Sequence, residues 1–148
     1  MEALTASEEE TEQFGRELAA RLSTEDVVYL QGELGSGKTC LTRGIAQGLG
    51  AIPRQVASPT FAILNEYVGS DGRIVLRHLD LYRLRDDPRD LDVLGLPESL
   101  AGAPVAVEWP GLTIRRLLPP TVEVAIELAP EGRRRFKISE SGPRSSGA

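Results

Sequence analysis

The chain has 148 residues and a net charge of −5, with 41% hydrophobic and 26% charged residues, which is typical of one soluble globular domain. Its single Cys and single His exclude an internal disulfide framework and any site built on several imidazoles, such as the usual catalytic zinc centre. No apolar run approaches the roughly 18–20 residues that span a bilayer, and the acidic N-terminus is unlike a secretory signal, so we expect a cytoplasmic protein without a membrane segment.

The first predicted element is a helix whose start is marked by a capping box. Ser7 can accept a hydrogen bond from a free backbone N–H group, and Glu10 can reach back toward the preceding chain. Phe14, Leu18 and Leu22 follow at intervals of four and share one helix face. The glutamates before them are interpreted as a solvated first turn. The rest of the chain is close to neutral, which gives no general attraction to nucleic acid, and no contact with DNA is expected.

A buried strand, a glycine-rich loop and a second helix follow in a specific order. The apolar run 27–30 is typical of a strand buried on both faces, and the helix is expected from Lys38 to Leu49. Between them, residues 32–39 read GELGSGKT and match the pattern G-x-x-x-x-G-K-[ST]. The glycines let backbone N–H groups surround a phosphate, Lys38 supplies a cation for the β and γ phosphates, and Thr39 offers a hydroxyl to Mg²⁺. A simple turn needs neither side chain, so the pattern predicts a nucleotide site.

A hairpin is predicted in the middle of the chain. Pro53 and Pro59 bracket a predicted loop, and strands are expected over 61–68 and 73–81 around the turn sequence Gly-Ser-Asp-Gly. The remaining predicted elements are short helices near 88–94 and 97–101 and strands over 104–107, 122–128 and 134–139. Together these elements predict an α/β fold in three layers, of the P-loop NTPase type, with a central mixed sheet that is partly antiparallel. One ATPase domain is expected over residues 1–140, and the polar tail 141–148 is predicted to be disordered.

Two acidic residues are candidates for metal binding and catalysis. In a P-loop sheet such residues end strands on the side of the phosphate loop. Asp80 follows the predicted strand 73–79, and Glu108 follows the strand 105–107. Either could hold Mg²⁺ directly, hold it through water, or polarise the attacking water. The alternative for each is a strand-end carboxylate paired with an arginine such as Arg83.

Other residues have weaker assignments. Thr60 lies in the loop where P-loop switches place a γ-phosphate sensor, although turn capping is the simpler interpretation. His78 alternates inward on its strand, which favours a hydrogen-bonded core histidine over a catalytic one. Trp109 and Cys40 are interpreted as packing residues. The arginines at 133–135 fit either a solvated strand edge or a contact with phosphate, nucleotide or RNA.

The order and spacing of these motifs resemble one protein family over nearly the whole chain. GELGSGKT, Arg43-Gly44, SPTF at 58–61, HLDLYR at 78–83 and VEWP at 107–110 look like the motifs of the TsaE (YjeE) family, bacterial ATPases of tRNA threonylcarbamoyladenosine (t6A) synthesis. Cys40 stands where the family more often has threonine. The resemblance implies ATP and Mg²⁺ as cofactors, slow hydrolysis, and action with a TsaB–TsaD-like complex, so that tRNA is served indirectly.

The resemblance also implies roles for individual residues. Thr39 and Glu108 would hold Mg²⁺, and Asp80 would assist the metal or activate water. Lys38, Asp80 and Glu108 would form the catalytic set. The residues expected to bind the nucleotide are Gly35, Ser36, Gly37, Lys38, Thr39, Cys40, Thr60 and Arg133. The adenine is expected near the start of the first helix, around 7–11, and near the turn at 132–133.

Two other functions are compatible with the same loop. A small-molecule or nucleoside kinase would need an acceptor pocket and an arginine-bearing lid, for which 83–89 is a short candidate. A nucleotide-gated binding module would control a partner without needing hydrolysis. A GTPase is disfavoured because the only Asn, Asn65, is followed by Glu66 and cannot begin a base-reading N-K-x-D motif.

Overall fold

The computed structural model describes residues 1–33, 35, 37–57, 64–82, 89 and 98–140. Its strands are β1 (Glu2–Thr5), β2 (Val27–Gln31), β3 (Ala51–Ala57), β4 (Leu64–Gly69), β5 (Ile74–Asp80), β6 (Val105–Glu108), β7 (Val122–Leu128) and β8 (Arg134–Glu140). Its helices are α1 (Glu8–Ala19), α2 (Lys38–Gly48) and α4 (Leu112–Leu117), with 3₁₀-helices η1 (Glu98–Leu100) and η2 (Pro130–Gly132). Within this part of the chain, no helix is long and apolar enough to cross a membrane.

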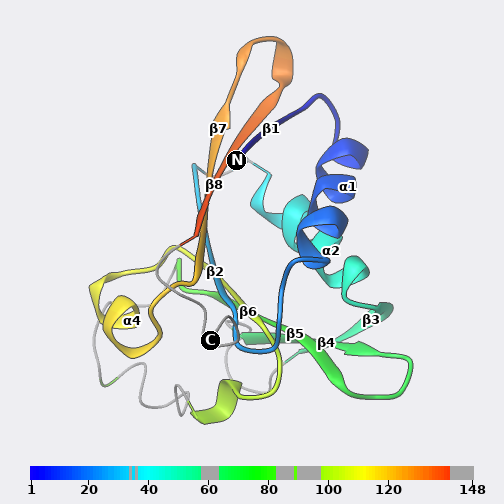
Figure 1. Ribbon diagram of the computed structural model, residues 1–148, viewed down its shortest axis with the longest axis vertical. Helices are drawn as coiled ribbons and strands as arrows, with labels where there is room; N and C mark the ends of the chain where they lie inside the picture. Colours follow the sequence, from blue (N-terminus) through cyan, green and yellow to red (C-terminus); the bar gives the residue numbers. More distant parts are fainter. Residues whose placement is uncertain (34, 36, 58–63, 83–88, 90–97, 141–148) are drawn as a thin grey trace.

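All the strands named above form one mixed sheet in the order β1-β8-β7-β2-β6-β5-β4-β3 (Figure 1). The central strands β7, β2, β6 and β5 run parallel, whereas β8 and β1 on one side and β4 and β3 on the other are added antiparallel. Helices α1 and α2 lie against one face of the sheet and α4 against the other (Figure 1). The predicted α/β fold with three layers and a partly antiparallel sheet is therefore confirmed.

Strand β2 lies in the centre of the sheet and joins its two cores. Val28 and Leu30 point into the core that α1 and α2 cover, whereas Val27 and Tyr29 point into the core on the α4 side. The Tyr29 hydroxyl donates to the carbonyl of Leu118 at 2.6 Å, which ties the end of α4 to the sheet. Burial raises the pKa of Tyr29 to about 12. The continuous apolar run of β2 is thus explained by burial on both faces.

Helices α1 and α2 pack at glycine contacts. A Cβ atom built on Gly44 of α2 would lie 2.2 Å from the backbone oxygen of Glu12 in α1. A Cβ atom on Gly15 of α1 would lie 2.6 Å from the backbone oxygen of Leu41 in α2. Glycine at these positions therefore allows the two helix backbones to touch. Both helices carry residues of the site described below.

The start of α1 follows the predicted capping box closely. Ser7 is the N-cap residue and accepts a hydrogen bond from the Glu10 N–H group at 3.1 Å. The Glu10 carboxylate accepts from the N–H group of Ala6 at 2.9 Å, one residue before the cap. The predicted strands 27–30, 104–107, 122–128 and 134–139, the helix from Lys38 and the hairpin around 69–72 are also confirmed.

Three parts of the chain differ from the predictions. The prediction of a loop from Pro53 is wrong for residues 53–57, because β3 continues to Ala57. This strand is at the sheet edge, and its pairing with β4 is irregular between Ala51 and Gln55, which accommodates a proline. Strand β1 and helix α4 were not predicted, because four and six residues are too short for a clear periodicity. The helix expected near 88–94, apart from residue 89, and the tail 141–148 lie outside the described residues.

Candidate functional site

The parallel register brings three strand ends to one edge of the sheet. Leu30 of β2 is paired with Glu108 of β6, and Glu108 is in turn paired with Asp80 of β5. The glycine-rich loop at 32–37, the predicted phosphate loop, begins directly after β2 ends at Gln31, at the same edge. The two acidic candidates therefore lie beside each other and beside the loop, as expected from their positions after buried strands. Lys38 and both carboxylates line the same cavity, and the two carboxylates oppose the burial that lowers the Lys38 pKa.

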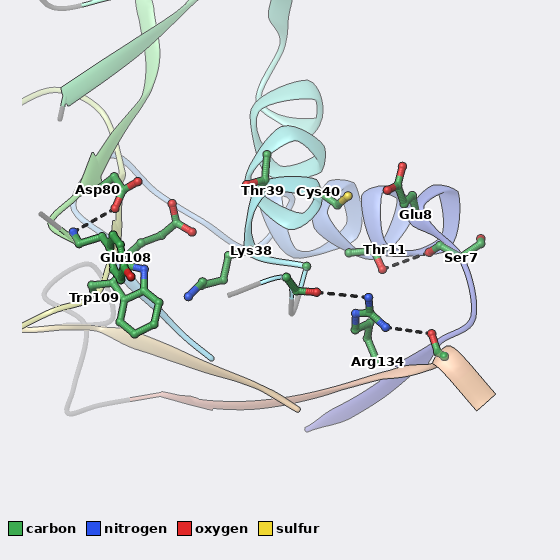
Figure 2. Close-up of a pocket in the computed structure, with 14 residues that line it drawn as sticks. Ser7, Glu8, Thr11, Lys38, Thr39, Cys40, Asp80, Glu108, Trp109 and Arg134 are labelled. Carbon is green, nitrogen blue, oxygen red and sulfur yellow. Dashed lines mark hydrogen bonds between the residues drawn. The ribbon is translucent and has the colours of Figure 1, made fainter. Parts of the chain in front are cut away.

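A cavity of about 470 Å³ lies where these strand ends meet α1, α2 and the η2 turn (Figure 2). It lies within the size range of small-molecule sites, roughly 300–1,000 Å³. The described residues that line it are Ser7, Glu8, Thr11, Gly35, Gly37, Lys38, Thr39, Cys40, Asp80, Tyr82, Glu108, Trp109, Gly132 and Arg134. Most of the predicted site residues therefore share one cavity, although they come from distant parts of the sequence.

The phosphate loop enters α2 through a backbone conformation that favours glycine. Gly35 has φ +79° and Gly37 has φ +114°, both in the left-handed region. Gly37 is the N-cap of α2 and has no side-chain oxygen that could compete with an anion for the first N–H groups. The positive end of the helix therefore faces the cavity, as a phosphate site requires.

Lys38 is held between the loop and Trp109. Its side chain is buried, with its ammonium group donating to the Gly32 carbonyl and lying 3.7 Å from the centroid of the Trp109 ring. Burial is the main cause of the lowered Lys38 pKa, and the neighbouring carboxylates oppose it. Trp109 itself has φ +58° and packs against Tyr82 with ring centroids 5.0 Å apart. The tryptophan, interpreted from sequence as a packing residue, is thus a wall of the cavity.

The acidic side of the cavity suits a metal that is shared with a phosphate group. Among the described residues, no group of three or more His, Cys, Asp or Glu side chains could hold a metal on its own. Mg²⁺ in nucleotide sites is usually bound through one or two carboxylates, with substrate phosphates and water completing the shell. The hydroxyl of Thr39 and the carboxylates of Asp80 and Glu108 line the same cavity, and these oxygen ligands fit such an ion.

The opposite side of the cavity is formed by α1 and the end of the β7–β8 connection. Ser7, Glu8 and Thr11 face Gly132 and Arg134 across it, in the region where the adenine was expected. Arg134 donates to the carbonyls of Gly132 at 2.9 Å and Gly35 at 3.2 Å (Figure 2). It thereby links the η2 turn to the phosphate loop.

Of the other residues predicted to bind the nucleotide, some line the cavity, one does not, and two are not described. Arg133 is not among the lining residues and pairs with Glu131 at 3.3 Å, so its neighbour Arg134 occupies the cavity wall. Cys40 is partly exposed in the cavity wall, and burial raises the pKa of its thiol. Ser36 and Thr60 lie outside the described residues. The nucleotide-binding roles of all these residues stay predictions.

The sequence interpretation of His78 as a buried, hydrogen-bonded histidine is confirmed. The contact that it makes was not foreseen, because its Nε2 atom lies 2.6 Å from Oε2 of Glu108. In the pairing of β5 with β6, this histidine lies two residues before the strand end at Asp80, opposite Ala106. A histidine two residues before a strand-end acid was the available signal, but only the sheet order identifies its partner.

The sheet topology, together with the glycine loop between β2 and α2, defines a protein of the P-loop class. The chain belongs to the TsaE family. The sequence model of that family, described as threonylcarbamoyl adenosine biosynthesis protein TsaE, matches residues 5–136.

Individual relatives and a solved structure are similar over almost the whole chain. The Bacillus subtilis protein named tRNA threonylcarbamoyladenosine biosynthesis protein TsaE is 40% identical over 141 residues, covering 95% of this chain and 85% of the relative. The protein of the same name from Rickettsia felis is 36% identical, covering 95% of this chain and 80% of the relative. The crystal structure of Bacillus subtilis YdiB superposes with a TM-score of 0.71 at 32% identity, covering 96% of this chain and 86% of that one.

Proposed function

We propose that this protein binds ATP with Mg²⁺ in the cavity and hydrolyses it slowly as a component of the t6A modification machinery. The observation that carries the proposal is the convergence of Lys38 and Thr39 with Asp80 and Glu108 on one cavity. Family membership supports the association with t6A biosynthesis. The coupling of hydrolysis to a TsaB–TsaD-like complex is part of the same proposal.

Each side of the cavity has a distinct role in this proposal. The N–H groups from Gly35 to Cys40 surround the phosphates, and Lys38 moves from the Gly32 carbonyl to a phosphate oxygen. Thr39 and Glu108 hold Mg²⁺, which neutralises charge on the β and γ phosphates when bound. Asp80 supports the metal or orients the attacking water. Residues at the start of α1 and in the η2 turn would hold the adenine.

Binding is tested with the two lysines of the chain, which form a matched pair. Lys38→Ala removes the loop cation, whereas Lys137→Ala removes an exposed cation on β8 that lies 3.6 Å from Glu127. We expect Lys38→Ala to lower nucleotide affinity or turnover by roughly 10²-fold or more, the scale of one lost transition-state donor. Lys137→Ala should leave both unchanged. Tight ATP binding with normal turnover in Lys38→Ala would refute the site.

Partner coupling needs a separate experiment. Purified TsaB- and TsaD-like proteins from the same organism are mixed with this protein in ATP, in ADP and without nucleotide, and complexes are separated by gel filtration. We expect complex formation to depend on the nucleotide, and t6A formation to require Asp80 and Glu108. Normal t6A formation with Asp80→Ala and Glu108→Ala would instead favour a nucleotide-gated binding module without required hydrolysis.

A further inference from the structure

The contact between His78 and Glu108 is a buried polar pair next to the cavity. His78 is the only histidine of the chain and is 8% exposed, and Glu108 is 5% exposed. In the β5–β6 register, His78 is paired with Ala106 and Asp80 with Glu108. The bond from Nε2 of His78 to Oε2 of Glu108, 2.6 Å long, therefore runs diagonally between the two strands.

The direction of this hydrogen bond follows from its chemistry. A carboxylate that holds a metal ion is deprotonated and can only accept hydrogen bonds, so in that state Nε2 of His78 is the donor. Hydrogen bonds to ionised groups are shorter and stronger than those between neutral groups. The bond fixes one carboxylate oxygen of Glu108 and so restricts the rotation of the whole group.

The two residues have different relations to the cavity. Glu108 lines it opposite the start of α2, whereas His78 is not among the lining residues. Figure 2 shows Glu108 grouped with Asp80 and Trp109 on the side of the cavity that faces Lys38. The contact with Glu108 is therefore a route by which His78 can affect a bound nucleotide without touching it.

We propose that His78 is a positioning residue that orients the Glu108 carboxylate toward a magnesium ion bound with the nucleotide. The inference rests on the proposed function, since it assigns to His78 a role in that same site. Hydrogen-bonding partners of metal ligands typically contribute 10–100-fold to metal affinity. The structure thus gives the buried histidine a role beyond filling the core.

The binding test compares three variants at increasing Mg²⁺ concentrations. His78→Leu removes the donor, His78→Gln keeps an amide donor, and Glu108→Gln removes the charged acceptor. Calorimetry measures ADP affinity with Mg²⁺ and in excess EDTA, and thermal melting checks the fold. We expect His78→Leu to raise about 10–100-fold the Mg²⁺ concentration at which half of the Mg²⁺-dependent gain in ADP affinity is reached. The ADP affinity measured without metal should be unchanged. His78→Gln should restore most of this loss.

Combining the substitutions tests whether His78 acts through Glu108. In the Glu108→Gln background, His78→Leu should have no further effect on Mg²⁺ dependence. The inference is overturned if the two effects add fully, if metal-free binding weakens equally, or if His78→Leu leaves Mg²⁺ dependence unchanged. Failure of the wild-type protein to bind ADP at any Mg²⁺ concentration would overturn the proposed function and the inference with it.

A second measurement needs no change of His78. Because the chain has one histidine, ¹⁵N-histidine labelling gives ring signals from His78 alone. We expect Glu108→Gln to shift the Nε2 resonance in the nucleotide-free protein, and Mg²⁺–ADP to shift it in the wild type but not in Glu108→Gln. Unchanged spectra in both comparisons would overturn the inference, even if wild-type nucleotide binding supported the proposed function.

Discussion

The contact between α1 and α2 can be tested by whether the substitution Gly44→Ala stabilises or destabilises the protein. Gly44 lies within α2, where alanine is intrinsically favoured over glycine by about 1 kcal/mol. If α1 were not packed against this position, Gly44→Ala should therefore stabilise the protein. The structure predicts the opposite, because the new Cβ atom would lie 2.2 Å from the Glu12 oxygen, where ordinary contact begins at 3.4 Å.

The magnitude follows from the same geometry. The three atoms nearest to a Cβ on Gly44 are backbone atoms of Glu12, which cannot move aside as the end of a flexible side chain could. Overpacking of this kind typically costs about 1–3 kcal/mol. A change of 1 kcal/mol shifts the melting temperature of a protein this size by about 2–4 °C. We therefore expect the overpacking cost to exceed the helix-propensity gain of about 1 kcal/mol, so that Gly44→Ala lowers the melting temperature by up to about 8 °C.

The assay is thermal unfolding followed by circular dichroism, with nucleotide titration on the folded variant. The control is Glu17→Ala, an exposed position of α1 whose carboxylate accepts a hydrogen bond from Gln13 of the same helix at 3.4 Å, and this change should stay within about 0.5 kcal/mol. Because α1 carries Ser7 and Thr11 at the cavity wall, moving it away should also weaken nucleotide binding. A melting temperature of Gly44→Ala equal to or above that of the wild type would refute the described helix contact.

Three further predictions concern single side chains. Arg134→Ala should weaken nucleotide binding measured by calorimetry while Arg133→Ala leaves it unchanged, since Arg134 donates to the Gly35 carbonyl whereas Arg133 pairs with Glu131; the reverse order would contradict this geometry. Emission from Trp109, the only tryptophan, should change when ADP with Mg²⁺ draws Lys38 away from its ring, and an unchanged spectrum at saturation would contradict that movement. Folding raises the pKa of Tyr29 from 10.0 to about 12, so the protonated form is favoured in the folded state and its contribution to stability is lost as pH rises from about 10 to 12. Denaturant titrations should show a smaller loss over this range in Tyr29→Phe, and an identical loss would refute the assignment.

The central part of the site could be predicted because its signals are local in sequence. The strand at 27–31, the glycine loop and the helix from Lys38 follow one another directly, and each has its own pattern. Asp80 and Glu108 each follow a buried strand, and parallel strands bring such residues to one edge of a sheet. The prediction needed only that both strands join the sheet of the phosphate loop.

Other parts of the site depend on pairings between distant segments. Arg134 reaches Gly35 because β8 is paired with β7, which lies beside β2, and no local pattern distinguishes it from Arg133. Trp109 meets Lys38 because β6 is the neighbour of β2. Strand β1 is four residues long and forms only by pairing with the far end of the chain, Glu2 with Lys137.

The sequence by itself therefore determined the phosphate loop, its strand and helix, and the two strand-end acids, because short-range periodicity and residue chemistry specify them. Only the tertiary structure decided which side chains complete the cavity, and it gave reasons for residues whose role the sequence left open. Gly44 is required by a helix crossing, and His78 is bound to a carboxylate on the neighbouring strand. In both cases the two segments are about 30 residues apart in sequence, as His78 and Glu108 are. Tertiary packing, rather than local pattern, decides how closely such segments approach in space.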